Sequence, residues 1–192
     1  MDQTISEPPS VRRQTVSAVA LVGFMGAGKT SVGQALAGRL GWRFEDLDEW
    51  IEKREGRTIE QIFGEDGEAA FRRMECAAVQ EVIQLRNRTP LVLALGGGAF
   101  MERDVQNCLQ GAQLPTVFLD ATVSELFRRS EQPGVKRPLR HDREQFRELY
   151  ERRRPEYLKA AICIETTGKT VTAVAQEIIV GLKLVPASGE SD

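Results

Sequence analysis

The segment "GFMGAGKT", residues 23–30, has the residue types and the spacing of a loop that binds phosphate. It matches G-x-x-x-x-G-K-[ST], in which glycines let backbone N–H groups point at phosphate oxygens where a helix begins. Lys29 is expected to contact the β- and γ-phosphates, and Thr30 to bind Mg²⁺. The alternative is a glycine-rich turn that matches by chance. The predicted nucleotide-binding residues of this loop are Gly26, Ala27, Gly28, Lys29, Thr30 and Ser31.

The segment "FEDLDEWIE", residues 44–52, places Asp46 and Asp48 two positions apart at the end of an expected strand. Residues i and i+2 of an extended segment point the same way, so both carboxylates can face the crevice at the strand ends. One could hold a metal-bound water, and the other could accept a hydrogen bond from an attacking hydroxyl. The alternative is that Asp48 only caps the next helix.

Short apolar runs alternate with helical patterns along the chain, which predicts βα units and a parallel sheet. Strands are predicted at residues 18–22, 43–46, 91–95, 116–119 and 162–164. Helices are predicted at residues 29–40, 48–54, 68–85, 122–129, 143–160 and 170–184. The 192 residues suit one domain, at 17–184, between flexible polar tails at 1–16 and 185–192. Residues 130–144 mix Pro, Gly and charge without apolar periodicity, which predicts a mobile lid.

Composition limits the partners and the compartment. With 26 Lys and Arg against 28 Asp and Glu, the net charge of -2 gives no basic field for nucleic acid. The three cysteines lack C-x-x-C spacing, which argues against a disulfide framework or zinc site and favours the cytoplasm. No run approaches the roughly 18 apolar residues of a membrane helix. Arg12 and Arg13 imitate a secretion leader, but the apolar run after them leads directly into the phosphate loop.

Other nucleotide-binding classes fit poorly. A GTPase of the Ras type would carry D-x-x-G and a guanine-binding N-K-x-D or T-K-x-D motif. None of these three motifs occurs in the sequence. A motor or transporter ATPase needs coupling modules for which the chain has no length. A small kinase remains.

From about residue 19 to residue 182 the sequence resembles the shikimate kinases. The resemblance rests on ordered motifs, which are "GFMGAGKT", F-x-D-x-D at 44–48, "IFGEDGEAAFRRME", "LALGGGA", "KRPL" and R-x-P-x-Y at 153–157. It implies transfer of the γ-phosphoryl group of ATP to the 3-hydroxyl of shikimate. It also implies an α/β P-loop kinase fold, a three-layer sandwich whose five-stranded parallel sheet has the order 2-3-1-4-5, with helices on both faces and a mobile lid.

The resemblance also implies roles for residues. Asp48 becomes the ligand of the shikimate hydroxyls and Asp46 the outer-sphere partner of one Mg²⁺. Arg137 becomes a lid residue over the phosphates, catalytic together with Lys29 and Asp48, and Arg129 a neighbour of the adenine. The implied acceptor site comprises Asp48, Arg72, Gly96, Gly97, Gly98 and Arg153, in which the two arginines bind the substrate carboxylate. We expect a cytoplasmic monomer that binds ATP and shikimate, and neither nucleic acid nor a membrane.

The two arginines also have local interpretations. Arg72 is placed in the first turn of its helix, where the macrodipole disfavours a cation by about 0.3–1 kcal/mol. Pairing with Glu68 or Glu75, an anionic ligand, or both would offset that. Residues 152–154 are all arginine, and successive helical residues point about 100° apart, so not all can reach one pocket. The spacing to Pro155 selects Arg153, and its two neighbours are assigned to the surface.

The metal ligand, the lid cation and the function each have an alternative assignment. "TVFLD" ends in Asp120, which resembles a Walker B strand, but "TVSE" after it has the form of a capping box. Asp120 is therefore the second choice for the metal after Asp46. Lys136 and Arg140 rival Arg137 in the lid, and Arg140 stands where the family often has an apolar residue. Two other functions are considered, a gluconate kinase and a nucleotide-binding module without catalysis.

Overall fold

The computed structural model describes residues 16–131 and 142–187. Five strands, all paired in parallel, form one sheet in the order β2-β3-β1-β4-β5, which confirms the predicted fold class and strand order. The predicted tails fall largely outside the described residues, as does most of the predicted lid, including Lys136, Arg137 and Arg140. The strands are β1 (Ala18–Val22), β2 (Arg43–Asp46), β3 (Leu91–Ala94), β4 (Thr116–Asp120) and β5 (Ile162–Glu165).

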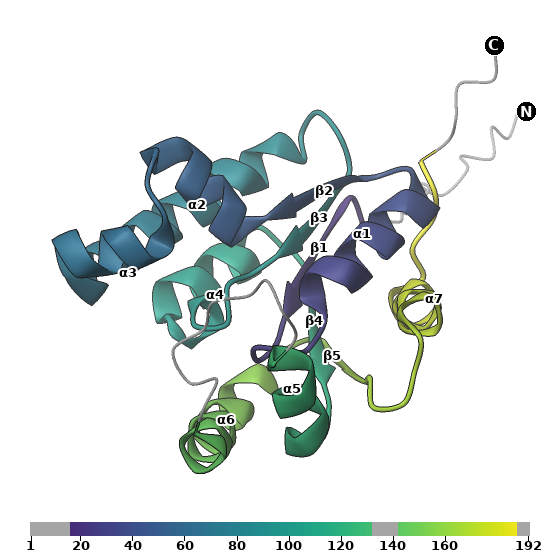
Figure 1. Ribbon diagram of the computed structural model, residues 1–192. Helices are drawn as coiled ribbons and strands as arrows, with labels where there is room; N and C mark the ends of the chain where they lie inside the picture. The colour runs from purple at the N-terminus through teal and green to yellow at the C-terminus, as the bar shows by residue number, and fades with distance from the viewer. Residues whose placement is uncertain (1–15, 132–141, 188–192) are drawn as a thin grey trace, which may run out of the picture.

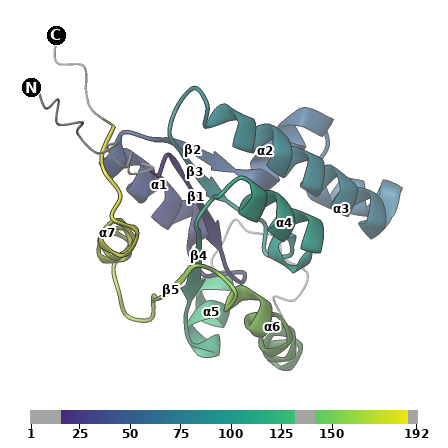
Figure 2. The same ribbon diagram turned by 180° about the vertical axis from the view of Figure 1, so that it is seen from behind.

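Helices cover both faces of this sheet. Helices α1 and α7 lie on one side, and α3, α4 and α6 lie on the other, as the two opposite views agree (Figures 1 and 2). Figure 1 also shows α5 beside α6 at the β4–β5 end of the sheet. The helices are α1 (Lys29–Leu40), α2 (Leu47–Glu55), α3 (Ile59–Leu85), α4 (Arg103–Gly111), α5 (Val123–Ser130), α6 (Arg143–Tyr157) and α7 (Val171–Leu182), with a 3-10 turn η1 (Ala99–Met101) before α4.

The apolar runs become the inner strands because a parallel sheet is covered on both faces. Every residue of β1, β3 and β4 is buried. The edge strands β2 and β5 are only partly buried, which fits their charged residues. Between β4 and α6, the rings of Phe118 and Tyr157 stack with their centroids 5.2 Å apart. Among the described residues, no helix is long and apolar enough to span a bilayer.

Two parts of the helical prediction are wrong. Helix α3 begins at Ile59 rather than residue 68, because Thr58 and Gln61 form a capping box there. Gly67, at φ 77° and ψ 170°, interrupts α3, so the predicted helix is its second half. Helix α4 was not predicted, since it is short and only Val105 and Leu109 face the core.

The topology brings the ends of four strands to one edge. Ala20 and Leu21 of β1 pair in register with Leu93 and Ala94 of β3 on one side, and β4 pairs with β1 on the other. The loops after β1, β2, β3 and β4 therefore open side by side, where parallel α/β sheets bind their ligands. These loops contain the phosphate loop, the two aspartates, the three glycines and Asp120.

Two glycines of α1 test how closely this helix approaches β2. A Cβ atom on Gly33 would lie 2.4 Å from the Phe44 ring, whereas one on Gly38 would have nothing within 4 Å. Gly38→Ala should raise the free energy of unfolding by about 0.5–1 kcal/mol, because alanine is the better helix residue. Gly33→Ala should lower it by about 1–3 kcal/mol, because the helix must move away from Phe44. Urea denaturation of both variants checks this, and equal shifts would contradict the close contact.

Candidate active site

The phosphate loop connects β1 to α1 and packs directly against α5. Gly26 has φ 82°, and a Cβ atom there would lie 2.3 Å from the carbonyl oxygen of Leu126. Gly28 has φ 88° and stands at the N-cap of α1. The Lys29 Nζ donates to the carbonyl oxygens of Gly23 at 2.9 Å and Phe24 at 3.2 Å. The loop therefore has the turns that the sequence predicted, with the ammonium group held against its own backbone.

Asp46 connects the phosphate loop to α2. Its Oδ2 accepts a hydrogen bond from the Thr30 hydroxyl at 2.8 Å, and its Oδ1 accepts one from the backbone N–H of Asp48 at 3.1 Å. Asp46 is therefore the N-cap of α2, and the alternative that Asp48 fills that position is wrong. A hydroxyl and a carboxylate side by side are hard oxygen donors, so the two predicted metal residues fit Mg²⁺.

Asp48 lies against Gly96 at the end of β3, but not for the reason that the sequence predicted. It is the second residue of α2 rather than part of an extended segment, because β2 ends at Asp46. Its Oδ1 lies only 2.5 Å from the position that a Cβ atom on Gly96 would take. The carboxylate thus rests against the backbone at the end of β3, beside the strand that leads to the phosphate loop.

The three glycines after β3 let different groups approach the main chain. A Cβ atom on Gly98 would lie 2.7 Å from Nη2 of Arg72. A Cβ atom on Gly97 would lie 3.8 Å from the backbone nitrogen of Met25 in the phosphate loop. The structure therefore brings the predicted acceptor residues of α2 and α3 together with the phosphate loop at Gly96, Gly97 and Gly98.

Arg72 pairs with both predicted glutamates. Its Nη1 donates to Glu75 at 2.7 Å and its Nη2 to Glu68 at 3.2 Å. Its Nε is buried and lies 3.5 Å from the Glu102 carboxylate, but makes no hydrogen bond to any described residue. The guanidinium also lies 5.3 Å from the centroid of the Phe71 ring. Two carboxylates thus orient Arg72, while one of its N–H groups stays without a hydrogen bond in the described part of the chain.

Arg153 approaches the same glycines from α6. Its Nη1 donates to the Gly97 carbonyl oxygen at 3.2 Å, and its guanidinium lies 6.0 Å from the Phe24 ring centroid in the phosphate loop. Tyr157, one turn further along α6, also donates to the Gly97 carbonyl, and burial raises the pKa of this hydroxyl to about 12. Arg152 is exposed, as predicted. The choice of Arg153 from the three arginines thus agrees with its position beside Gly97.

Asp120, the second choice for the metal, is fully engaged by protein groups. Its carboxylate accepts hydrogen bonds from the Ala121 backbone, the Tyr150 hydroxyl and Arg154. Arg154 is at the surface as predicted, since its side chain is 43% exposed, but its ion pair with Asp120 was not predicted. An aspartate already paired with a cation has little affinity left for a metal. The predicted capping box is also wrong, because the Thr122 side chain makes no capping hydrogen bond.

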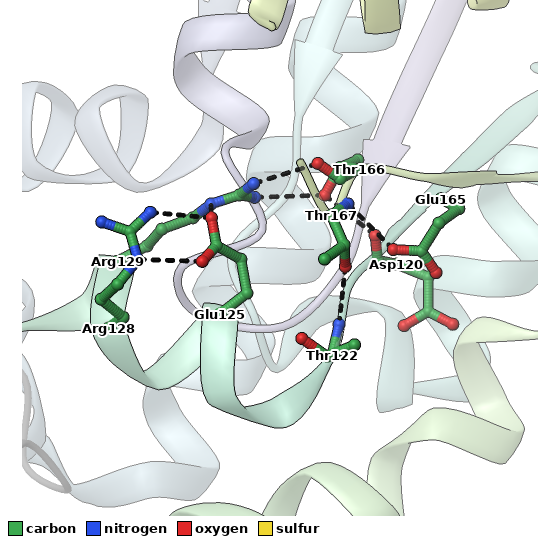
Figure 3. Close-up of polar contacts among 8 residues, drawn as sticks. All are labelled: Asp120, Thr122, Glu125, Arg128, Arg129, Glu165, Thr166 and Thr167. Carbon is green, nitrogen blue, oxygen red and sulfur yellow. Dashed lines mark hydrogen bonds and ion pairs between the residues drawn. The ribbon is translucent and has the colours of Figure 1, made fainter. Parts of the chain in front are cut away.

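Arg129 ties α5 to the end of β5 (Figure 3). It donates to Glu125 at 2.8 Å, to the Thr166 hydroxyl at 3.1 Å and to the Thr166 carbonyl at 3.0 Å. Leu126, three residues earlier, touches Gly26, so Arg129 stands one helical turn from the phosphate loop. Its role beside adenine stays a prediction, and the catalytic role of Arg137 falls outside the described residues.

Sequence reasoning treated Glu75 only as a partner for Arg72. Glu75 is buried, and burial raises the pKa of its carboxyl to about 7, with Arg72 opposing the shift and Asp48 and Glu102 adding to it. A Cβ atom on Gly96 would lie 3.3 Å from Glu75 as well as 2.5 Å from Asp48, so the two carboxylates converge. The signal was available, because a glutamate at 75 interrupts an apolar stripe at 71, 78 and 82.

Phe63 lies beside the ring of Phe71, the residue before Arg72, and was not among the predicted site residues. It lies in the first half of α3, its ring centroid is 4.6 Å from that of Phe71, and it is 37% exposed. The predicted helix began at residue 68, so Phe63 fell outside it.

The fold and the site define a P-loop kinase for a small acceptor, with a phosphate loop, an aspartate hydrogen-bonded to its threonine and two guanidinium groups at one sheet edge. The family model described as shikimate kinase matches residues 25–183. A shikimate kinase from Thermus thermophilus is 43% identical over 164 residues, which cover 84% of this chain and 87% of that one. This chain belongs to the shikimate kinase family.

Solved structures agree. A shikimate kinase from Bacteroides thetaiotaomicron has a TM-score of 0.79 at 30% identity, and the match covers 87% of this chain and 98% of that one. A shikimate kinase from Acinetobacter baumannii, solved in complex with shikimate, has a TM-score of 0.77 at 34% identity, and the match covers 89% and 97% of the two chains. The resemblance on which the sequence analysis relied is thus confirmed at the level of the family.

The buried Glu75 makes stability depend on pH. Its pKa is raised to about 7 in the folded protein from 4.5, so its contribution to stability is complete below pH 4.5 and is lost as the pH rises to 7. Between pH 5 and pH 8, wild type should therefore lose about 2 kcal/mol of unfolding free energy relative to Glu75→Gln. Urea denaturation at both pH values measures this difference.

Glu68→Gln provides the control, because Glu68 is 71% exposed in its side chain and also pairs with Arg72. This variant should follow the pH dependence of wild type. Parallel curves for wild type and Glu75→Gln would show that Glu75 has no raised pKa.

Proposed function

We propose that this chain transfers the γ-phosphoryl group of ATP to the 3-hydroxyl of shikimate, giving shikimate 3-phosphate and ADP in aromatic amino acid biosynthesis. The observation that supports this most is the convergence of Asp48, Arg72 and Arg153 on the three glycines beside the phosphate loop. A nucleotide site alone would not need these three groups. Because the chain belongs to the shikimate kinase family, we identify the acceptor as shikimate.

In the nucleotide half, Lys29 neutralises charge that develops on the transferring phosphoryl group, and we assign the same role to Arg137, which lies outside the described residues. The hydrogen-bonded pair of Thr30 and Asp46 would hold one Mg²⁺ per chain, which would neutralise phosphate charge when bound. The residues that bind ATP are Gly26, Ala27, Gly28, Lys29, Thr30, Ser31, Arg129 and Arg137.

In the acceptor half, Asp48 accepts a hydrogen bond from the hydroxyl that attacks and so orients it toward the phosphate loop. Position supports this, because Asp48 and the phosphate loop both lie against the glycine segment after β3. The backbone of Gly96, Gly97 and Gly98 lines the same crevice. Orientation of the reacting hydroxyl reduces the entropy cost of the reaction.

Arg72 and Arg153 bind the carboxylate of the acceptor. They reach the glycine segment from α3 and α6, and a guanidinium is the side chain that best matches a planar carboxylate. Glu75 and Glu68 hold Arg72 in its orientation at 2.7 and 3.2 Å, which reduces the entropy lost on binding. The two cations therefore select an acceptor that carries an acid.

We also propose the remaining organisation of the molecule. A single kinase domain spans residues 17–184, with a lid at about 130–144 and flexible tails at 1–16 and 185–192. It acts as a cytoplasmic monomer on ATP and shikimate, without nucleic acid or membrane. The net charge of -2 supports the absence of a nucleic-acid partner.

An acceptor panel tests the function directly. ADP release by the purified chain is measured with Mg²⁺ and ATP, and with shikimate, gluconate or no acceptor. Release that depends on shikimate supports the proposal. Release that depends only on gluconate would favour the gluconate kinase, and nucleotide binding without acceptor-dependent release would favour the module without catalysis.

Neighbouring glycines should give different kinetic defects when each is replaced by alanine. Gly96→Ala places its Cβ atom 2.5 Å from Asp48 and must displace that carboxylate. A shift of about 1 Å can cost on the order of 10²-fold in rate, so kcat should fall. Gly98→Ala places its Cβ atom 2.7 Å from Arg72, so KM for shikimate should rise by about tenfold, with KM for ATP unchanged. Steady-state kinetics with each substrate varied measures both, and identical defects would contradict the separate roles.

A further inference from the structure

Adjacent arginines of α6 make contacts in two different places. Arg153 donates to the Gly97 carbonyl oxygen at 3.2 Å, beside the proposed acceptor site. Arg154 donates to Oδ2 of Asp120 through Nε at 3.1 Å and Nη2 at 2.8 Å, at the end of β4. Successive residues of a helix point about 100° apart, so the rotation of α6 that satisfies one arginine also sets the direction of the other.

Asp120 is a strong anchor because its carboxylate is buried, with the residue only 4% exposed. Besides Arg154, it accepts the Ala121 backbone N–H at 2.9 Å and the Tyr150 hydroxyl. Burial and the neighbouring carboxylate raise the pKa of Tyr150, so this hydroxyl remains a donor at neutral pH. A buried charge that has a cation and several hydrogen bonds is costly to disturb, so this cluster resists rotation of α6.

The same face of α6 also touches the phosphate loop. The Phe24 ring of that loop makes edge contacts with Phe146 at 5.0 Å and Tyr150 at 5.5 Å between centroids. Tyr150 therefore joins Asp120 to Phe24. The cluster orients α6 relative to β4 and the phosphate loop together, and Arg153 projects from the helix that is held in this way.

We propose that Asp120, Tyr150 and Arg154 form a positioning cluster that fixes the rotation of α6 and thereby holds Arg153 at the acceptor carboxylate. Arg154 is a positioning residue that acts through Arg153, and it touches neither substrate. This proposal rests on the proposed function, in which Arg153 binds the carboxylate of shikimate. It assigns a role to a guanidinium that sequence position alone places on the surface.

The first measurement compares Arg154→Ala with Arg152→Ala, the exposed neighbour on the same helix. Without its ion pair to Asp120, α6 can rotate and Arg153 loses alignment. KM for shikimate should rise by about tenfold in Arg154→Ala, which corresponds to about 1.4 kcal/mol, with kcat and KM for ATP close to wild type. Arg152→Ala should leave all three constants unchanged.

A double-mutant cycle separates positioning from a general loss of structure. If Arg154 acts through Arg153, replacing Arg154 in an Arg153→Ala background should raise KM for shikimate little further, because there is no guanidinium left to position. Arg154→Lys should recover part of the affinity, since an ammonium group can still pair with Asp120. Tyr150→Phe keeps the ring on Phe24 but removes one donor to Asp120, and it should raise KM by about threefold.

The outcomes are distinct. If wild type releases no ADP in response to shikimate, the proposed function fails before the variants are considered. If wild type is active and Arg154→Ala leaves KM unchanged, or its effect adds fully to that of Arg153→Ala, the positioning role is wrong. If Arg154→Ala does not fold, Tyr150→Phe decides, and an unchanged KM for shikimate in that variant overturns the proposal.

Discussion

The site depends on a stretch of main chain without side chains at the end of β3. Gly96, Gly97 and Gly98 occupy the point where α2, α3, α6 and the phosphate loop converge, and a Cβ atom on Gly96 or Gly98 would fall within 2.7 Å of Asp48 or Arg72. A buried central strand therefore ends in a segment that other elements can approach directly. The volume that a side chain would fill is available to functional groups and to a small substrate.

Two buried carboxylates contact arginines at or next to the proposed acceptor site. Glu75 holds Arg72 directly, and Asp120 holds Arg154, the neighbour of Arg153. A buried ion pair is weak evidence for stability, since desolvation offsets much of the attraction. Its stronger effect is geometric, because a guanidinium that faces a fixed carboxylate keeps one orientation. The chain thus uses buried acids to position cations that would otherwise sample many rotamers.

Local sequence patterns predicted those helices and strands whose bounds depend on residues within the same segment. The bounds of β1, β2 and α1 follow from apolar runs and from glycines, and the observed elements match. Helix α4 was missed, although the step between parallel strands β3 and β4 needs a crossover of about a dozen residues or more, usually with a helix. The beginning of α3 was missed because the T-x-x-Q pattern at Thr58 was not considered. Both signals were in the sequence.

The sequence named residues that the structure brings to one sheet edge, but it did not predict the contacts by which they are held there. Asp48 lies against Gly96 although β2 ends two residues earlier, because Asp46 caps α2 with the same carboxylate that accepts the Thr30 hydroxyl. The pairing of Asp120 with Arg154 joins residues 34 positions apart, so no local pattern contains it. The family resemblance supplied the sheet order and the residue roles, and it says nothing about which side chains hold the site residues in place.

The raised pKa of Glu75 has a consequence for recognition of an acid. If Glu75 were fully ionised, it would neutralise Arg72 and, together with Asp48, repel an anionic substrate. Burial raises its pKa to about 7, so near neutral pH a substantial fraction of the molecules carry the protonated form. In that form one fewer carboxylate offsets the charge of Arg72, although Glu68 at 3.2 Å and Glu102 at 3.5 Å still face it. Its buried Nε has no hydrogen bond to any described residue. Under the proposed function, an acceptor carboxylate would meet a guanidinium whose orientation is already fixed, which is the condition for attraction without prior reorganisation.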